Sequence, residues 1–174
     1  MAHGKHEAAQ SRRQAEYRKT ALILIAVLCA AALILLLLFT QVLAVVRYHG
    51  DGMEPELSSG ETLILLRSKK AEQGDVIAFY YNNQLLVRRV IATGGQQISI
   101  AEDGIVSVNG TVLDEPYVTR PSYGQCNIEF PYYVPPENVF TMGDSRSIAM
   151  DSRLSEIGTV SSDRILGKIL FVLG

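Results

Sequence analysis

A polar stretch at residues 48–61 holds the side chains of this 174-residue chain that are best suited to chemistry. It contains His49, Asp51, Ser58 and Ser59, which supply an imidazole, a carboxylate and two hydroxyls. These are the parts of a Ser–His–Asp set, in which the imidazole takes a proton from the attacking hydroxyl. A serine pair before a glycine is usually part of a turn, so a nucleophile here depends on hydrogen-bond geometry that a sequence does not give.

Two pairs of basic residues are the other candidates for proton transfer or anion binding. Arg88 and Arg89 lie in an apolar segment, whereas Lys69 and Lys70 lie in a charged connection. A guanidinium stays protonated and has no acceptor lone pair, so Arg88 can bind an anion but cannot act as a base. The lysines are interpreted as solvated loop residues, because lysine is rarely buried without a partner.

Short strands separated by turns are predicted to position these residues. The hairpin at residues 76–91 and a second tight turn at 109–110 have Asn or Gly where positive φ is needed. Residues 114–138 are dense in Pro, Tyr and polar residues and are expected to form a long excursion with little regular structure. The predicted strands are residues 61–67, 76–81, 84–91, 97–100, 105–108, 111–112, 139–142 and 165–171. We therefore predict a mainly β domain over residues 47–174, built as a coiled sheet or partly closed barrel.

An apolar run before this domain is long enough to cross a membrane. Residues 21–39 carry no polar or charged side chain, and residues 42–46 extend the apolar character past Thr40 and Gln41. A helix needs about 20 residues to span a bilayer core, and a run without a polar face has no amphipathic side to place against a soluble core. We predict one transmembrane anchor at residues 21–46.

A cleaved signal peptide is the alternative for this run, since Val42-Leu43-Ala44 is weakly similar to a processing site. The run exceeds the about 7–15 residues of an ordinary signal-peptide core, which favours an uncleaved anchor. Arg47 follows the run, whereas five basic residues precede it: Lys5, Arg12, Arg13, Arg18 and Lys19. The positive-inside rule then predicts a single-pass plasma-membrane protein, with residues 1–20 as a cytoplasmic basic tail and the domain outside the cytoplasm.

The distribution of charge argues against a nucleic-acid-binding domain, and the cysteine content argues against a disulfide-stabilised one. The net charge is −2 with His neutral, and the tail is basic, so the folded part is acidic and is not expected to bind nucleic acid. Cys29 lies in the apolar run and Cys126 is the other cysteine, so no disulfide framework is available. The sequence predicts no cofactor and no metal site.

Five short motifs behind the anchor resemble those of the type I signal peptidase family. Each is weak alone, but their order and spacing identify the chain as a member, with a resemblance that extends to about Lys168. The motifs are Gly-Met-Glu-Pro at 52–55 with Leu57 and Gly60-Glu61, Gly-Asp-Val-Ile at 74–77, Arg-Arg-Val-Ile at 88–91, Leu-Asp-Glu-Pro-Tyr at 113–117, and Gly-Asp-Ser-Arg-Ser-Ile-Ala-Met-Asp-Ser-Arg at 143–153.

The resemblance implies an anchored, extracytoplasmic enzyme that removes signal peptides from exported proteins with a Ser–Lys pair. In this chain, Gly52 stands at the nucleophile position, Arg88 at the general-base position and Ala149 at the position of a serine that supports the lysine. Without a hydroxyl at Gly52 no acyl-enzyme can form by the family route. The resemblance also implies that four retained residues brace the loop beside the site: Asp144, Arg146, Asp151 and Arg153.

These replacements predict a pseudoenzyme that keeps a groove for an extended peptide and adds that peptide as a strand. Exported precursors, pilus subunits, a sortase and the lipid bilayer are the partners that the resemblance implies, because some signal-peptidase-like proteins of Gram-positive bacteria act in pilus assembly. The alternative is an active signal peptidase, a serine endopeptidase that uses substituted residues such as Ser58 or Ser59. The predicted groove residues are Gly50, Asp51, Gly52, Met53, Pro55 and Arg88.

Overall fold

The structure is a computed structural model that describes residues 3–174, with side chains from Tyr17 onward except that of Leu38. The chain divides into two compact units, Met1–Val42 and Leu43–Gly174. Of the basic tail predicted at residues 1–20, the first two residues and the side chains of residues 3–16 lie outside this description.

The first unit is the helix α1 (His3–Val42). Its segment Tyr17–Val42 is long and apolar enough to cross a membrane, with a mean hydropathy of 3.4 in its most apolar window and none of that window buried. The helix ends at Val42, so the last residues of the segment predicted as an anchor, 43–46, belong to strand β1 (Leu43–Arg47). There they pair antiparallel with β2 (Thr62–Leu66).

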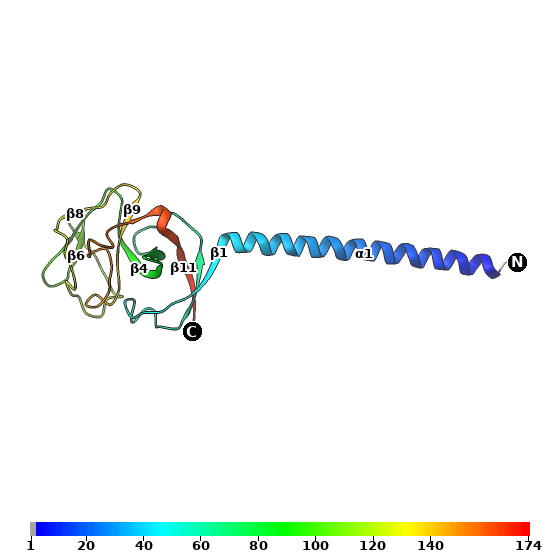
Figure 1. The fold of residues 1–174 in the computed structure, drawn as a ribbon, viewed down its shortest axis with the longest axis horizontal. Coiled ribbons are helices and arrows are strands. Elements are labelled where there is room, and N and C mark those ends of the chain that lie inside the picture. The colour runs from blue at the N-terminus through cyan, green and yellow to red at the C-terminus, as the bar shows by residue number, and fades with distance from the viewer. Residues whose placement is uncertain (1–2) are drawn as a thin grey trace. The chain divides into compact units, whose positions relative to one another are not determined.

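The second unit contains two antiparallel sheets (Figure 1). The larger sheet has the order β1, β2, β11 (Ile165–Leu173), β3 (Val76–Tyr81), β4 (Gln84–Thr93), β9 (Asn138–Met142) and β10 (Val160–Ser161). The smaller sheet has the order β7 (Thr111–Val112), β6 (Val106–Val108), β5 (Gln97–Ile100) and β8 (Tyr132–Tyr133). A short 3₁₀ helix, η1 (Ser162–Arg164), precedes β11.

The prediction of a mainly β domain is confirmed, and within the described residues neither sheet closes into a barrel. The hairpin of β3 and β4 turns at Asn82 and Asn83, whose φ angles of 45° and 61° are the positive values that such a turn needs. Asn109 has a φ of 50° at the turn between β6 and β7. The sequence did not predict β1, β8 or β10 as strands, since the last two are short and β1 continues the apolar run.

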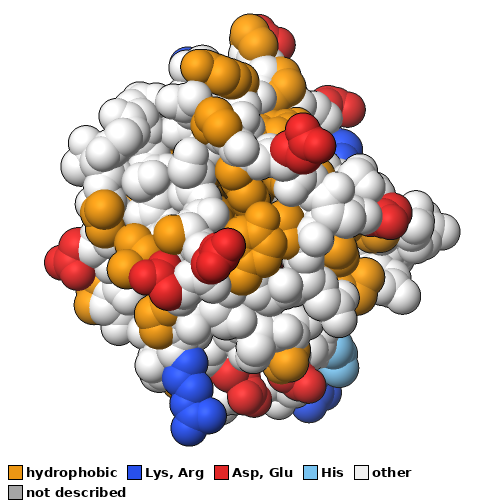
Figure 2. All heavy atoms as spheres, turned by 90° about the vertical axis from the view of Figure 1, so that its left-hand side faces the viewer, with side chains coloured by type: hydrophobic (Ala, Val, Ile, Leu, Met, Phe, Trp, Pro, Cys, Tyr) orange, Lys and Arg blue, Asp and Glu red, His pale blue; other side chains and the backbone are white. Residues whose placement is uncertain are grey.

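Three clusters of buried side chains form the core. One joins the two sheets, because Ile91 and Phe140 of the larger sheet pack with Ile98 and Val108 of the smaller sheet. Another packs the loop after β1 against β2, β3 and β4, and a third lies around β10 and the start of β11. On the face shown in Figure 2, hydrophobic side chains gather near the centre and acidic side chains lie around them.

Candidate functional site

The loop that follows β1 is fixed at both ends and in its middle. Its ends are joined by two backbone bonds, from Tyr48 N to Glu61 O and from Gly60 N to Tyr48 O, each 2.8 Å long. In its middle, the buried side chains of Met53 and Leu57 pack into the core. Because both side chains point inward, the backbone of Gly52 is held in one buried position.

Arg88 of β4 lies directly over Gly52. A Cβ at Gly52 would be 3.0 Å from Cζ, Nη1 and Nη2 of Arg88. This distance is shorter than ordinary contact between carbon atoms, which is about 3.5–4.0 Å. The end of the Arg88 side chain would therefore have to move by a few tenths of an ångström to admit a side chain at residue 52.

Ala149, the third replaced position, lies at the same place. A Cβ at Gly143 would collide with both the Cβ of Ala149 and the carbonyl oxygen of Gly52, so these two atoms flank one glycine. Two backbone bonds hold the loops together, from Ser145 N to Gly52 O at 3.1 Å and from Ala149 N to Ser145 O at 3.1 Å. The structure thus brings Gly52, Arg88 and Ala149 together from three separate parts of the chain.

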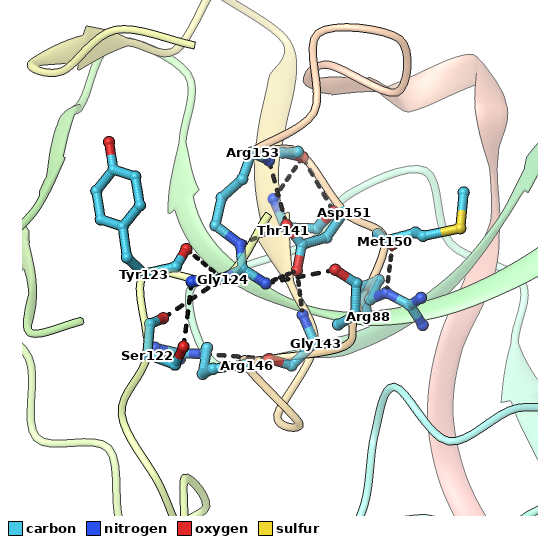
Figure 3. A network of polar contacts seen from close by, with 12 residues as sticks. Arg88, Ser122, Tyr123, Gly124, Thr141, Gly143, Arg146, Met150, Asp151 and Arg153 are labelled. Carbon is cyan, nitrogen blue, oxygen red and sulfur yellow. Dashed lines mark hydrogen bonds and ion pairs between the residues drawn. The ribbon is translucent and has the colours of Figure 1, made fainter. Parts of the chain in front are cut away.

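Buried ion pairs hold the segment that carries Ala149 (Figure 3). Asp151 binds Arg153 through two bonds of 2.8 Å, Nε to Oδ1 and Nη2 to Oδ2, and Oδ2 also accepts the backbone N–H of Gly143 at 3.0 Å. Arg153 Nη1 donates to the carbonyl of Tyr123 at 2.8 Å. Both side chains of the Asp151–Arg153 pair are fully buried, so the segment is tied to the 122–124 loop and to β9.

Asp144 and Arg146 do not pair with each other, although they are close in sequence. Asp144 accepts two bonds from Arg89, at 2.9 and 2.6 Å, and Arg146 donates to Glu115 at 2.9 and 2.5 Å. The Arg89 guanidinium also lies 4.0 Å from the centre of the Tyr117 ring, a cation–π contact. The Leu-Asp-Glu-Pro-Tyr motif is therefore fixed to the site through Glu115 and Tyr117.

The electrostatic environment of Arg88 differs from that of the other buried arginines. Burial lowers the pKa of its guanidinium, and the negative charge of Asp151 opposes this shift. Burial also raises the pKa of the neighbouring Tyr48 hydroxyl, against the positive charge of Arg88. Lysine can become a base when its pKa is lowered by burial, but arginine keeps its proton and offers no lone pair.

An open cavity of about 390 Å³ lies over these residues. Four of the predicted groove residues surround it: Gly50, Asp51, Gly52 and Arg88. Apolar side chains from β4 and from the 143–153 segment complete its wall: Leu85, Leu86, Val87, Ile148 and Met150. Exposed Ile148 and Met150 lie beside a buried guanidinium in this lining, which suits a peptide with apolar side chains better than a small polar molecule.

Two predicted groove residues lie elsewhere. Met53 is fully buried in the core, because the loop turns its side chain inward. Pro55 is exposed and lines a separate cavity with Glu54, Thr119 and Arg120. Of the predicted groove residues, Met53 therefore belongs to the core and Pro55 to another surface cavity.

The alternative nucleophiles do not form a catalytic set within the described residues. Ser58 and Ser59 are exposed, and the Ser59 hydroxyl accepts the backbone N–H of Gly50 at 3.3 Å. No hydrogen bond joins either serine to His49 or Asp51 in this part of the chain, although His49 and Asp51 also line the groove.

Lys69 and Lys70 lie outside the groove. Both are exposed, and Lys69 Nζ donates to the carbonyls of Asp163 and Ile165 at 2.8 and 2.9 Å. They line a cavity of about 500 Å³ that also includes Glu72, Glu137 and η1 residue Ser162. Lys69 therefore holds the connection before β11.

Three residues of the site were not predicted. Tyr48 lies under the groove with its side chain 3% exposed, Met150 accepts a bond from Arg88 Nε through its carbonyl at 2.8 Å, and Glu115 binds Arg146. Tyr48 is the first residue of the stretch at 48–61, so its position was a usable signal. The other two contacts join residues that are far apart in sequence.

Comparison with known proteins agrees with the motifs. The family model described as signal peptidase, peptidase S26, matches residues 18–173. Signal peptidase IB of Staphylococcus aureus (strain Mu50) is 31% identical over 142 residues, which cover 70% of this chain and 73% of that protein. The probable signal peptidase I-1 of Synechocystis is 33% identical over 159 residues, which cover 83% of this chain and 78% of that protein.

Among solved structures, the crystal structure of a signal peptidase I from Enterococcus faecalis V583 matches 59% of this chain and 97% of that chain, with 26% identity and a TM-score of 0.49. The motifs, the β domain behind an apolar helix and the family model together define a signal peptidase I-like protein. The chain belongs to the signal peptidase family, peptidase S26.

Proposed function

We propose that this chain is a membrane-anchored member of its family that does not cleave peptides and instead binds extended segments of exported proteins. The contact between Gly52 and Arg88 is the observation that carries this proposal. The nucleophile position has no side chain, and the group that lies over it is a guanidinium that cannot accept a proton.

The free edge of β4 supports peptide binding. One edge of β4 pairs with β3 from Gln84 to Arg89, whereas β9 pairs with the opposite edge only from Arg89 to Thr93. Within the described residues, no strand therefore covers the second edge of residues 84–88, and residues 85–88 line the groove. An extended peptide can add to such an edge through main-chain hydrogen bonds.

The membrane arrangement is part of the same proposal. The apolar part of the helix segment Tyr17–Val42, from residue 21 onward, is the single span, residues 1–20 lie in the cytoplasm and the β domain lies outside it, by the basic residues that precede the span. The clients are exported precursors or pilus subunits, held next to the bilayer by the anchor. For pilus subunits, the neighbouring enzyme is a sortase.

A cleavage assay tests the loss of activity. The full chain, purified in detergent and returned to lipid vesicles, is incubated with an exported precursor, and new N-termini are sought by mass spectrometry. We expect no mature N-terminus, while the precursor binds saturably to the same vesicles. Cleavage by the unchanged chain would overturn the proposal.

The second candidate is an active signal peptidase, which the names of the relatives favour. It requires another nucleophile, and the two candidates in the loop are Ser58 and Ser59. Cleavage that disappears in Ser58→Ala or Ser59→Ala would establish this candidate, with Ser155→Ala as a control for an exposed loop serine outside the groove.

A further inference from the structure

We infer that Arg88 and Tyr48 form a carboxylate site at the end of the groove, which recognises the free C-terminus of a bound peptide. This inference deepens the proposed function, because it rests on a peptide that lies along β4. It assigns a role to Arg88 that a lysine base does not have.

Arg88 is a buried cation with more N–H donors than hydrogen bonds to protein carbonyls. Its side chain belongs to a residue that is 6% exposed, and its protein hydrogen bonds run from Nε to Met150 O at 2.8 Å and from Nη1 to Val87 O at 2.6 Å. A guanidinium has five N–H groups, so these two bonds leave three, which interact with the Tyr48 hydroxyl but form no ion pair in the described part of the chain.

No carboxylate neutralises Arg88 within the described residues. The other three buried arginines each have an ion pair, Arg89 with Asp144, Arg146 with Glu115 and Arg153 with Asp151. Asp151 is the carboxylate whose charge acts most on Arg88, but its oxygens are used by Arg153 and by the Gly143 amide. The guanidinium end of Arg88 points away from that pair (Figure 3).

Such a group is costly to bury without an anion. Removing a charge from water costs several kcal/mol unless a partner of opposite charge or good hydrogen bonds replace the water. Arg88 lines the open groove, so an anion that enters the groove can reach its free N–H groups. The site is therefore incomplete without a ligand of negative charge.

Tyr48 supplies a second unsatisfied donor at the same place. Its hydroxyl is buried and makes no hydrogen bond of ordinary length and angle in the described part of the chain, although it lies close enough to the Arg88 guanidinium and the Met53 backbone to interact with both. Tyr48 lines the same groove, and the positive charge of Arg88 acts on its hydroxyl. A buried hydroxyl without a partner is uncommon in proteins, and a carboxylate has two oxygens that can accept from both residues.

The shape and charge of the groove favour a peptide C-terminus over other anions. The free edge of β4 leads along residues 85–87 to Arg88, so a chain that adds to this edge and ends there places its α-carboxylate at the guanidinium. Asp51, which is exposed at the groove, disfavours a multiply charged phosphate group. Leu86, Ile148 and Met150 suit apolar side chains of the same peptide.

A matched pair of peptides tests the inference on the unchanged protein. The full chain in detergent micelles is titrated with the peptide Leu-Leu-Val-Ala-Gln-Ala, labelled with a fluorophore at its N-terminus, as the free acid and as the C-terminal amide. Binding is followed by fluorescence anisotropy. We expect the acid to bind about tenfold more tightly than the amide, since charge-assisted hydrogen bonds are roughly twice as strong as neutral ones.

Two variants test whether Arg88 causes the preference for the peptide acid over the amide. In Arg88→Met the acid and the amide should bind with equal affinity, whereas Arg120→Met, which removes an exposed arginine outside the groove, should keep the tenfold preference of the unchanged protein. Equal binding of acid and amide to the unchanged protein overturns the inference and leaves the proposed function standing. Absence of saturable binding of both peptides overturns the two together.

Discussion

The guanidinium of Arg88 and the backbone of Gly52 are complementary in volume, with three guanidinium atoms 3.0 Å from the position that a Cβ at residue 52 would take. Neither residue alone explains this contact. A serine at position 52 needs the space that Arg88 fills, and a shorter or differently placed side chain at position 88 would leave a void over Gly52. The two replacements therefore depend on each other.

This dependence predicts the stability of single and double variants. Gly52→Ser alone should cost on the order of 1 kcal/mol, because the new side chain pushes the guanidinium of Arg88 by a few tenths of an ångström and strains its bonds to Met150 and Val87. Adding Arg88→Lys should recover part of that cost. A double-mutant cycle on denaturant unfolding of the β domain in the solubilised chain measures the coupling, and strict additivity would contradict the prediction.

The buried pair of Asp151 and Arg153 is predicted to be essential for folding of the 143–153 segment. Asp151→Ala should destabilise the domain by about 3–5 kcal/mol, because it leaves a fully buried guanidinium without its partner. The change also removes the acceptor of the Gly143 amide. The measurement is the midpoint of denaturant unfolding.

Asp75→Asn is the matched control for that measurement. Asp75 pairs with Lys168 at 3.4 Å, and both side chains are partly exposed. Partly exposed pairs contribute little, so the expected cost is below about 1 kcal/mol. Similar losses of unfolding free energy for Asp151→Ala and Asp75→Asn would show that the buried pair stabilises the domain no more than the partly exposed pair does.

Tyr117 gives the domain a dependence on alkaline pH. Burial, followed by the charge of Glu115 and its hydrogen bond, raises the pKa of Tyr117 well above the ordinary tyrosine value of about 10. Because the pKa is higher in the folded state, its contribution to stability is fully present below pH of about 10 and is lost as pH rises through the folded value. Unfolding midpoints should fall over that range.

Tyr117→Phe isolates this contribution. The variant should show a smaller loss of stability above pH of about 10 than the unchanged protein, and a smaller rise in tyrosinate absorbance when the domain unfolds at high pH. Tyr133→Phe, at an exposed tyrosine of β8, serves as the control. An identical alkaline profile for the unchanged protein and Tyr117→Phe would contradict the assignment.

The sequence predicted what depends on neighbours along the chain and missed what depends on distant contacts. The turn at Asn82 and Asn83 is local chemistry, and the hairpin was predicted correctly. Residues 43–46 continue an apolar run, and periodicity alone does not separate a helix end from a buried strand. Their strand conformation comes from pairing with β2.

The same distinction applies to the site. The three replaced positions were found from motifs, but the contact of Arg88 with Gly52 joins residues on different elements. The ion-pair partners of Asp144 and Arg146 could not be predicted from the sequence either, because Arg89 and Glu115 come from other parts of the chain. Burial of Met53 could not be separated from a place in the groove, since an apolar residue suits both.

Tyr48 offers a test that separates stability from binding. Its buried hydroxyl makes no hydrogen bond of ordinary geometry in the described part of the chain, and a poorly paired buried polar group costs about 1–3 kcal/mol. Tyr48→Phe should therefore leave the stability of the domain unchanged or raise it, while it weakens binding of a peptide acid and spares binding of the amide. A clear loss of stability would show that the hydroxyl has a partner in solution.

Peptidase activity should return only when all three replaced residues are changed together. Gly52→Ser supplies a hydroxyl, Arg88→Lys supplies a base and frees the space over residue 52, and Ala149→Ser supplies a hydroxyl at the position that shares the contact with Gly143. Residues that act as one catalytic unit have strongly non-additive effects. We expect cleavage of an exported precursor by the triple variant, followed as a new mature N-terminus, and none by any single variant.

The control for this experiment is the triple variant with Gly52→Ala in place of Gly52→Ser. It has the same lysine and the same serine at position 149, and it fills the space at position 52 without a hydroxyl. Cleavage by the serine form alone would show that the scaffold still presents a peptide to this point and that the chemistry was lost at three residues. Equal cleavage by both forms would place the nucleophile elsewhere and contradict the interpretation of Gly52 as the vacant position.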